Sequence, residues 1–335
     1  MTDPHPSVAV LSTASIQLNR ETSRSLEEML FDASREALAS AGMSIDDMDA
    51  VVVSGNDETD GRVISIMPAS GPTGGVGRDL TMTASSGDHA LIYGWMRVRA
   101  GQSGRVLVVG WSKPSEGVDP DHAELVEAEP YLLRDIGMNH TAAAALQASL
   151  LQDATTGDGP VVAWPLTAGD LPVRGDTVHA LVIAADGAFE PGAEQAWILD
   201  CGWATGAYEL GQRELAEFSS LRAALGQVEA RGEAPAPASW DAAEIGADSE
   251  PAVRAVAGLL GLADGAAVNP SGALGGVITS PHVQGLTRMV AAIQRVAQGA
   301  AAVAGGIGFH GFAGQGATVA VFAGQKGAGQ KGMGA

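Results

Sequence analysis

Two adjacent hydroxyl side chains, Ser85 and Ser86, stand before a glycine in the segment TASSGDHAL (residues 83–91). The segment separates a short apolar run from a helical pattern, which predicts a sharp turn from a strand into a helix. Backbone N–H groups and the helix dipole favour negative charge at such a turn, so a serine there could act as a nucleophile. A tight turn whose helix is capped by Ser86 explains the same residues without any chemistry.

Two histidines stand in turns near the end of the chain. His310 lies in the glycine-rich segment FHGFAGQG (residues 309–316), between two runs with strand character. Its imidazole titrates near neutral pH and could act as an acid or a base, or it could simply pack within its loop. His282 follows the turn NPSGALGG (residues 269–276) and directly precedes a helical pattern.

An α/β framework is predicted around these turns, because apolar runs without polar alternation alternate with amphipathic helical patterns. In the first half we expect strands at 8–13, 49–54, 79–83, 105–109, 161–164 and 178–184, helices at 24–43, 89–100 and 139–151, and an acidic irregular segment at 112–135. In the second half we expect strands at 196–201, 241–245, 301–309 and 316–322, and helices at 212–229, 251–260 and 285–298.

The order of elements in the two halves is alike, which indicates an internal duplication. The predicted halves are residues 1–190 and 195–323, each within the usual size of a domain. Residues 324–335 (GQKGAGQKGMGA) have low complexity and are expected to be disordered.

Composition excludes several classes of protein and site. The formal net charge of the 335 residues is −20 and no Lys/Arg cluster occurs, so we expect neither nucleic-acid binding nor attraction to anionic membranes. No uninterrupted apolar stretch reaches the length of about 18 residues that a spanning helix needs. The single cysteine, Cys201, excludes an internal disulfide, fits a cytoplasmic protein and is expected in the core. No His/Cys spacing suggests a metal site, and none is predicted.

Several of these segments, in their order along the chain, resemble the thiolase superfamily. The resemblance rests on ASAGM, ASSGDHAL, VLVVGWSK, DAAEIGADSEPAVRA, NPSGALGG and HGFAGQG, and it covers nearly the whole length. It implies a duplicated five-layer αβαβα fold, an obligate dimer or tetramer, and Claisen-type carbon–carbon bond formation or cleavage. It also implies a coenzyme A thioester as substrate and no covalently bound cofactor.

The family's catalytic pattern is depleted in this sequence. Its nucleophilic cysteine falls on Ala84, whose methyl group cannot attack a thioester, and Ser85 and Ser86 lie beside that position rather than on it. The asparagine or histidine that helps bind the first oxyanion falls on Gly246, which has no side-chain donor. Because loss of one oxyanion donor costs about 10²–10³-fold in rate, the resemblance implies that ordinary thiolase activity is lost.

The remaining catalytic positions of the family fall on or near histidines. Its active-site histidine aligns near Thr279 or Ser280, two or three residues before His282. Its second cysteine falls on His310, as in the sterol-carrier-type thiolases, whose closing motif begins with histidine. His310 is thus a retained acid/base candidate. The residues that the resemblance places in a coenzyme A site are Ser271, Gly272 and His282.

Two functions follow from this resemblance. The first is a subunit without its own catalytic cysteine that supports an active partner in an acyl-CoA-processing complex. It would dimerise with itself or with a cysteine-containing thiolase-like chain, and a small OB-fold/zinc-ribbon protein that binds acyl-CoA could join them. The second is a cysteine-independent aldolase or acyltransferase acting on a CoA thioester, with catalysis by His310 together with Ser85 or Ser86.

Overall fold

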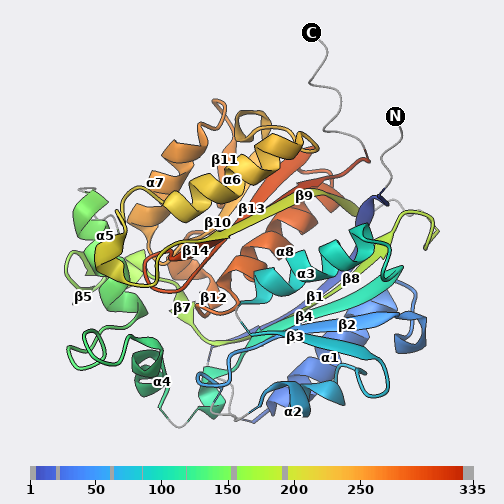
Figure 1. Cartoon of the computed structure of the whole chain (residues 1–335), viewed down its shortest axis with the longest axis horizontal. Coiled ribbons are helices and arrows are strands. Elements are labelled where there is room, and N and C mark those ends of the chain that lie inside the picture. The colour runs from blue at the N-terminus through green and yellow to red at the C-terminus, as the bar shows by residue number, and fades with distance from the viewer. Residues whose placement is uncertain are drawn as a thin grey trace.

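Figure 1 shows the computed structural model of the chain, in which helices cover a large central sheet. The structure describes residues 5–19, 23–60, 64–84, 86–117, 119–151, 157–190 and 195–326. Within these ranges no helix combines the length and the apolar character needed to cross a lipid bilayer. Residues 327–335, most of the tail expected to be disordered, lie outside them.

The first half supplies one side of the main sheet and carries a long insertion. Its elements are β1 (Val8–Leu18), α1 (Leu26–Ser40), β2 (Ala50–Ser54), α2 (Ile66–Ser70), β3 (Asp79–Thr83), α3 (Gly87–Arg99), β4 (Arg105–Ser112) and β8 (Asp176–Ala185). The insertion, between β4 and β8, contains α4 (Pro120–Glu127), α5 (His140–Leu151), β5 (Val161–Ala163), β6 (Leu166–Thr167) and β7 (Val173–Arg174).

The second half repeats this order of elements without a comparable insertion. It consists of β9 (Ala196–Thr205), α6 (Ser219–Arg231), β10 (Ala242–Gly246), α7 (Glu250–Leu260), β11 (Ala267–Val268), β12 (Ile278–Thr279), α8 (Gln284–Ala297), β13 (Val303–His310) and β14 (Gly316–Ala323). β12 pairs with β7 of the insertion, outside the main sheet.

The main sheet has the order β11-β10-β13-β14-β9-β1-β8-β4-β2-β3. From the central pair β9 and β1 outward, the strands of the two halves follow one another in the corresponding order. β1 and β9 are the middle strands, at the seam between the halves. The next strand outward, β8 in the first half and β14 in the second, runs antiparallel to both its neighbours, and the three outer strands of each half run parallel to one another. The two copies meet where β1 pairs antiparallel with β9, from Val8↔Ile198 to Val10↔Ala196. The predicted duplicated α/β fold is therefore confirmed.

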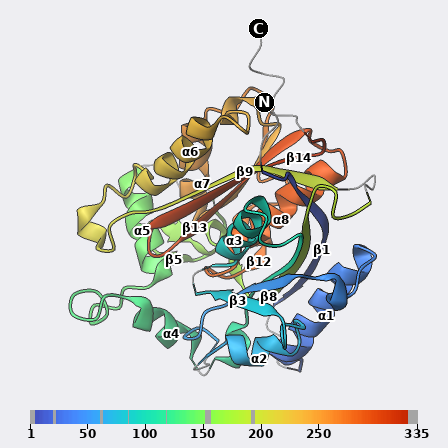
Figure 2. The same ribbon diagram turned by 45° about the vertical axis from the view of Figure 1, so that its right-hand side comes forward.

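Three buried clusters divide the molecule into five layers. α1 packs through Leu26 and Met29 on the outer face of the first-half strands. α3 and α8 lie in the centre, where Leu91 and Leu286 belong to a cluster that includes strand residues of both halves. α6 and α7 cover the outer face of the second half. Figure 2 shows α3 and α8 between the two sets of strands, so the N-termini of both helices lie inside the molecule.

Some elements differ from their predictions. Residues 161–164 contain β5, which pairs with β6 in a small separate sheet, because β8 already fills the place between β1 and β4. The segment 112–135, expected to be irregular, contains α4. The helix expected at 212–229 begins only at Ser219, since Phe218 before it has a left-handed φ of 47°.

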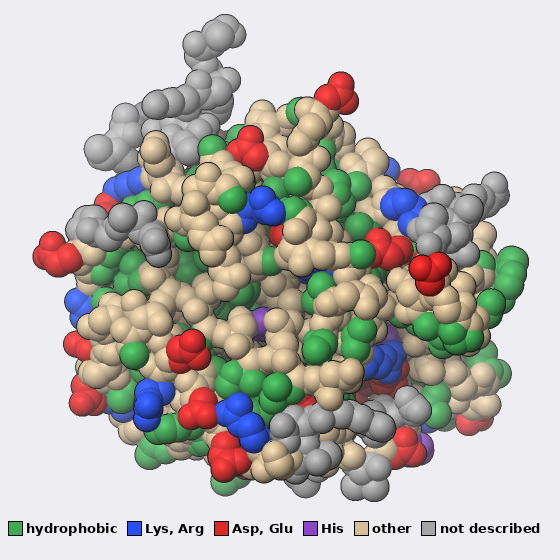
Figure 3. All heavy atoms as spheres, turned by 180° about the vertical axis from the view of Figure 1, so that it is seen from behind, with side chains coloured by type: hydrophobic (Ala, Val, Ile, Leu, Met, Phe, Trp, Pro, Cys, Tyr) green, Lys and Arg blue, Asp and Glu red, His purple; other side chains and the backbone are tan. Residues whose placement is uncertain are grey.

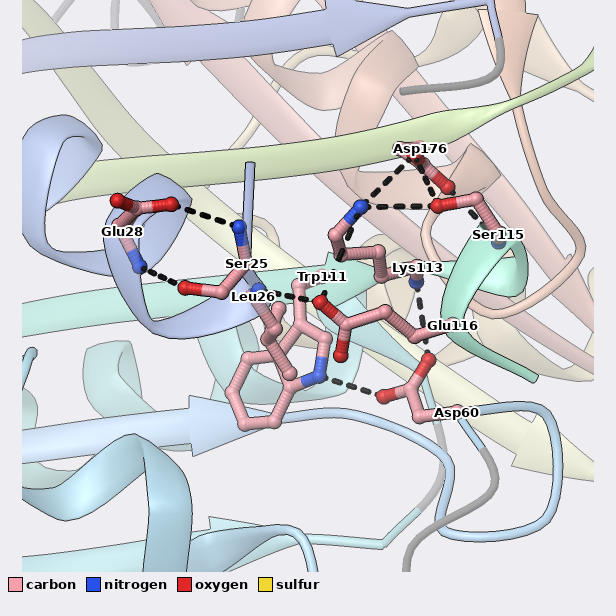
Figure 4. A network of polar contacts seen from close by, with 9 residues as sticks. All are labelled: Ser25, Leu26, Glu28, Asp60, Trp111, Lys113, Ser115, Glu116 and Asp176. Carbon is pink, nitrogen blue, oxygen red and sulfur yellow. Dashed lines mark hydrogen bonds and ion pairs between the residues drawn. The ribbon is translucent and has the colours of Figure 1, made fainter. Parts of the chain in front are cut away.

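A buried polar network ties the start of the insertion to the first half (Figure 4). The Trp111 indole N–H donates to Asp60 over 2.6 Å, and the same carboxylate accepts from the Lys113 backbone N–H over 2.9 Å. The Lys113 ammonium is fully buried, with Nζ 3.1 Å from Asp176 Oδ2. A paired carboxylate offsets the cost of removing this ammonium from water, so the insertion leaves the sheet from a fixed point.

The surface charge is mixed rather than segregated on the face shown in Figure 3. Acidic and basic side chains are interspersed there, with apolar side chains between them. Among the residues drawn in colour, that face therefore carries no basic patch of the kind that a nucleic acid requires.

Candidate functional site

The turn from β3 into α3 carries the predicted nucleophile positions. Ala84 is exposed and offers only a methyl group, and Ser85 lies outside the described residues. Ser86 is the N-cap residue of α3, but its side chain makes no capping bond to the described backbone, contrary to the expected cap. Its buried hydroxyl donates instead to Asp88 Oδ1. Ser86 is therefore engaged by a carboxylate rather than free for attack.

Asp88, in the first turn of α3, is fully buried and accepts a hydrogen bond at each oxygen. Ser86 donates to Oδ1, and Thr318 of β14 donates to Oδ2. Gly308 and Gly285 pack so closely against it that an added Cβ would lie 2.5 Å and 2.6 Å, respectively, from atoms of the carboxylate. The carboxylate thus joins the N-terminus of α3 to β13, β14 and the start of α8.

His310, the last residue of β13, meets His89 of α3 beside this carboxylate. The two ring centroids are 4.4 Å apart in an edge-to-face arrangement, and His89 Nδ1 lies 3.2 Å from Ser86 Oγ. Within the described part of the chain, His310 Nδ1 is buried without a hydrogen-bond partner. Burial and the charge of His89 lower the pKa of His310 to about 4, although Asp88 opposes them. The imidazole is neutral at physiological pH and can accept a proton.

His282 contacts the same helix end through its backbone, but its imidazole faces elsewhere. Its carbonyl accepts from the Gly87 N–H over 2.9 Å. Its Nε2 lies 2.8 Å from Glu127 Oε1, although the N–H does not point along that line and the pair is not a hydrogen bond. The other oxygen of Glu127 lies 2.9 Å from Nε2 of His140, the first residue of α5.

Mutual charge stabilisation characterises this second cluster. Burial alone would raise the pKa of Glu127, but His282 and His140 hold it well below its usual range. Burial alone would lower the pKa of His140, but Glu127 and the nearby Asp248 raise it. The pKa of Asp248 is itself raised by burial, in spite of His140 and Arg174. The cluster therefore favours a charged state, unlike His310.

A cavity of about 680 Å³ opens beside the second cluster, between the insertion and the second half. His140 and Asp248 line it, together with Arg174 and Gln284. Apolar groups of β5 and of the segment before β7 complete its wall, among them Val162. The cavity thus combines an apolar lining with a few polar groups on one side, which is typical of a small-molecule site.

The predicted coenzyme A pair, Ser271 and Gly272, belongs to an internal ion-pair network. The Ser271 hydroxyl donates to Glu244 over 2.6 Å, and Arg288 Nη1 lies 3.1 Å from that carboxylate and donates to the Gly272 carbonyl over 2.9 Å. None of Ser271, Gly272 and His282 lines the 680 Å³ cavity, so the structure does not gather the predicted coenzyme A residues there. Their role in coenzyme A binding stays a prediction.

Comparisons with known proteins give one weak sequence match and strong structural ones. No protein-family model matches the chain. A 97-residue segment is 36% identical to beta-ketoacyl-[acyl-carrier-protein] synthase III 4 of Streptomyces coelicolor, covering 28% of this chain and 31% of that protein. The match therefore spans about a third of the length of that curated relative.

Solved structures match the chain almost end to end. Human mitochondrial 3-ketoacyl-CoA thiolase superposes with a TM-score of 0.72 at 14% identity, covering 95% of this chain and 99% of that one. The same protein in complex with CoA gives a TM-score of 0.73 at 15% identity, covering 95% and 98%. The chain has the thiolase-like fold. At these identities the likeness establishes the fold, and the predicted resemblance is confirmed at that level.

Within this thiolase-like fold, the residue at the position predicted for the oxyanion donor has no side chain, and the neighbouring backbone leaves little room for one. Gly246 ends β10, and an added Cβ would lie 3.1 Å from the Gln284 carbonyl oxygen and 3.2 Å from that of Ile307. A donor side chain would therefore require neighbouring backbone to move. Cys201 lies fully buried in β9 with its pKa raised well above the ordinary value by burial, so it is a core residue, as predicted.

Three polar residues of the thiolase-like chain were missed as candidates from sequence. Glu127 lies in the acidic segment expected to be irregular, where nothing separates it from its acidic neighbours. Asp88 directly precedes His89 in the elbow segment, and Asp248 follows Gly246 by two positions. The signal for the last two was their place at the ends of strands and starts of helices, where polar side chains of α/β proteins converge.

Proposed function

We propose that this thiolase-like chain is a component of a complex that acts on acyl-CoA thioesters and forms no acyl-enzyme of its own. The observation that carries the proposal is the β3–α3 turn, where Ala84 occupies the position expected for the nucleophile. A solved relative in fold is described as bound to CoA, which supports a CoA thioester as the ligand class.

The neighbouring hydroxyl is a poor substitute for a nucleophile. Ser86 is 1% exposed, and its proton is donated to Asp88 rather than to an imidazole. A serine nucleophile needs a base that accepts its proton, since the free hydroxyl is weakly reactive at neutral pH. Since Gly246 also has no side chain that could donate to an oxyanion, both the activated nucleophile and the side-chain oxyanion donor of covalent acyl transfer are missing.

The edge of the main sheet supports association with another chain. Among the described residues, β3 is the last strand of the sheet and pairs only with β2. An unpaired edge is a template for a further strand, and exposed apolar side chains lie close to it in sequence, at Met67 and Val76. We propose that this edge receives a second thiolase-like chain, either a cysteine-containing one or a copy of this one.

Purification of the tagged full-length chain from its native cells, followed by native mass spectrometry, tests the proposal. We expect a stoichiometric second thiolase-like chain that carries a cysteine at the position of Ala84. The double variant Met67→Asp/Val76→Asp should lose that chain and keep its melting temperature, whereas Tyr131→Asp, an exposed residue elsewhere, should retain it. A monomer, or a complex indifferent to the double variant, would contradict this assignment. A small OB-fold/zinc-ribbon protein in the complex would add the third predicted partner.

A second candidate is non-covalent acid–base catalysis on a CoA thioester. It is favoured by the neutral imidazole of His310, which lies beside His89 with a buried unpartnered nitrogen in the described structure. A positioned acid or base contributes about 10²–10⁴-fold to a rate, so His310→Gln should lower carbon–carbon cleavage by that factor. Under the first proposal the same variant keeps its partner and the activity of the complex.

A further inference from the structure

We propose that Glu127, His140 and His282 form a binding site for one divalent transition-metal cation beside the 680 Å³ cavity, which His140 lines. One ligand atom from each residue lies within 4.8 Å of the other two. Two imidazoles and one carboxylate are a set that holds Zn²⁺ or Fe²⁺ in many proteins. No sequence spacing shows this set, because its members come from α4, α5 and the loop before α8.

The contacts within the cluster fit convergence on a common point. His140 Nε2 and His282 Nε2 lie 2.9 Å and 2.8 Å from the two oxygens of Glu127. Two ligand atoms of a tetrahedral site, each about 2.0–2.1 Å from the metal, are about 3.3 Å apart, so shifts of about half an ångström would bring these atoms onto one cation. The N–H of His282 is not aimed at the carboxylate, so this nitrogen has no hydrogen-bond partner among the described residues. With its proton on Nδ1, the imidazole could instead bind a cation beside the carboxylate through the lone pair of Nε2.

The three ligands are held in place by the fold before any cation binds. Glu127 is the last residue of α4 and His140 is the first of α5. The backbone beside His282 is fixed to α3 through the bond from the Gly87 N–H. Ligands on fixed elements lose little entropy on binding, which favours a specific site over chance contact.

The second histidine cluster provides the internal contrast. Asp88, His89 and His310 also bring three ligand atoms together. Both oxygens of Asp88, however, already accept hydrogen bonds from buried hydroxyls, those of Ser86 and Thr318. A cation there would have to break two buried hydrogen bonds, whereas the Glu127 carboxylate accepts only one long hydrogen bond, of 3.4 Å from Asn56 Nδ2, besides its contacts with the two imidazoles among the described residues. We therefore assign the cation to the Glu127 cluster.

The position of the site gives the cation a function. Three protein ligands leave coordination positions open for water or substrate, and His140 lines the cavity. A cation there could polarise a carbonyl oxygen of a bound acyl group and so replace the oxyanion donor that Gly246 lacks. This part rests on the proposed function, whereas the binding of the cation does not.

Calorimetric titration of the EDTA-treated full-length protein with Zn²⁺, and with Co²⁺ followed by visible absorption, tests the site. We expect one equivalent to bind, with Co²⁺ bands typical of nitrogen and oxygen ligands. Glu127→Gln and His282→Ala should each weaken binding by about 100-fold or more, because even loss of an outer-shell partner costs 10–100-fold. His310→Ala should bind as the unaltered protein does.

Three outcomes would overturn the assignment. They are the absence of saturable binding, binding that survives both ligand variants, and binding that His310→Ala abolishes equally. Circular dichroism of each variant shows whether it is folded, and Glu127→Gln, which keeps the size of a partly exposed side chain, gives the mildest change. A protein that binds no metal but still purifies with its partner would refute the metal site and leave the proposed function standing.

Discussion

The two histidine clusters each contain one carboxylate and two imidazoles, yet they favour opposite charge states of the histidine. Beside α3, the Asp88 carboxylate accepts from two hydroxyls, and the pKa of His310 is lowered to about 4. Beside the cavity, the Glu127 carboxylate contacts two imidazoles, and the pKa of His140 is raised. Both imidazoles are largely buried, so burial alone does not decide their charge.

We infer that the charge of the histidine depends on whether the oxygens of the neighbouring carboxylate already accept hydrogen bonds from hydroxyl groups. A carboxylate that accepts from uncharged hydroxyls gives a neighbouring imidazole only a distant Coulomb attraction. A carboxylate in direct contact stabilises the imidazolium enough to outweigh desolvation. The first arrangement suits a base that must be free of its proton, and the second suits an ion pair or a cation site. The following changes would break or sharpen this contrast.

The largest effect is expected from Asp88→Ala. The substitution leaves two buried hydroxyls, Ser86 and Thr318, without their acceptor, and each costs about 1–3 kcal/mol. Urea denaturation should show a loss of about 3 kcal/mol or more. Glu127→Ala is the matched change in the other cluster and should cost less, because water can enter there from the cavity. An equal loss in both variants would remove the distinction between a structural and an accessible carboxylate.

Acid pH should destabilise the protein through His310. Its pKa is about 4 in the folded protein and near 6.5 when unfolded, so the unfolded chain binds more protons between these values. Stability therefore falls as the pH drops from 6.5 towards 4, by up to about 3 kcal/mol. His310→Gln lacks this titration, so its stability should fall less over the same window, measured by denaturation at each pH. Parallel curves for the two proteins would show that His310 is not held neutral.

A smaller loss of stability is expected from Thr318→Val. The substitution should also make the Asp88 cluster more like the Glu127 cluster in the charge of its histidine. Loss of one hydroxyl should cost about 1–2 kcal/mol. It also frees Asp88 Oδ2 for the imidazoles nearby, which should raise the pKa of His310 towards its ordinary value. Proton NMR of the imidazole ring across a pH titration measures this shift. An unchanged pKa would mean that the hydroxyls do not control the charge of the histidine.

The smallest change in stability is expected from Ala84→Cys. This residue is exposed, so the free energy of unfolding should stay within about 0.5 kcal/mol. Intact-mass measurement after incubation with an acyl-CoA should show no rapid adduct, because Gly246 has no side chain to donate to the oxyanion. Ala84→Ser serves as the control for chemistry at the same place. Fast acylation of the cysteine variant would show that the turn retains the elements of covalent catalysis.

The sequence predicts the framework well and the site only in part. The spacing of apolar residues predicts buried strands such as β2 and amphipathic helices such as α1. Both kinds of pattern occur in each half of the chain. The clusters depend on side chains that only the fold brings together. Glu127 and His282 lie in different halves of the chain, and no local pattern distinguishes Glu127 from the other acidic residues around it. His310 is identified because its turn has a recognisable form.

The place of β1 has a consequence for how the chain folds during synthesis. β1 ends at Leu18, yet its neighbours in the sheet are β8, which begins at Asp176, and β9, which begins at Ala196. The first half cannot close until nearly two hundred residues have left the ribosome, and contacts so distant in sequence form slowly. We expect fragments that end before β8 to expose the edges of β1 and β4 and to aggregate. The seam that joins the two copies can therefore form only after the whole first half has been made, and β13 and β14 complete the second half later still.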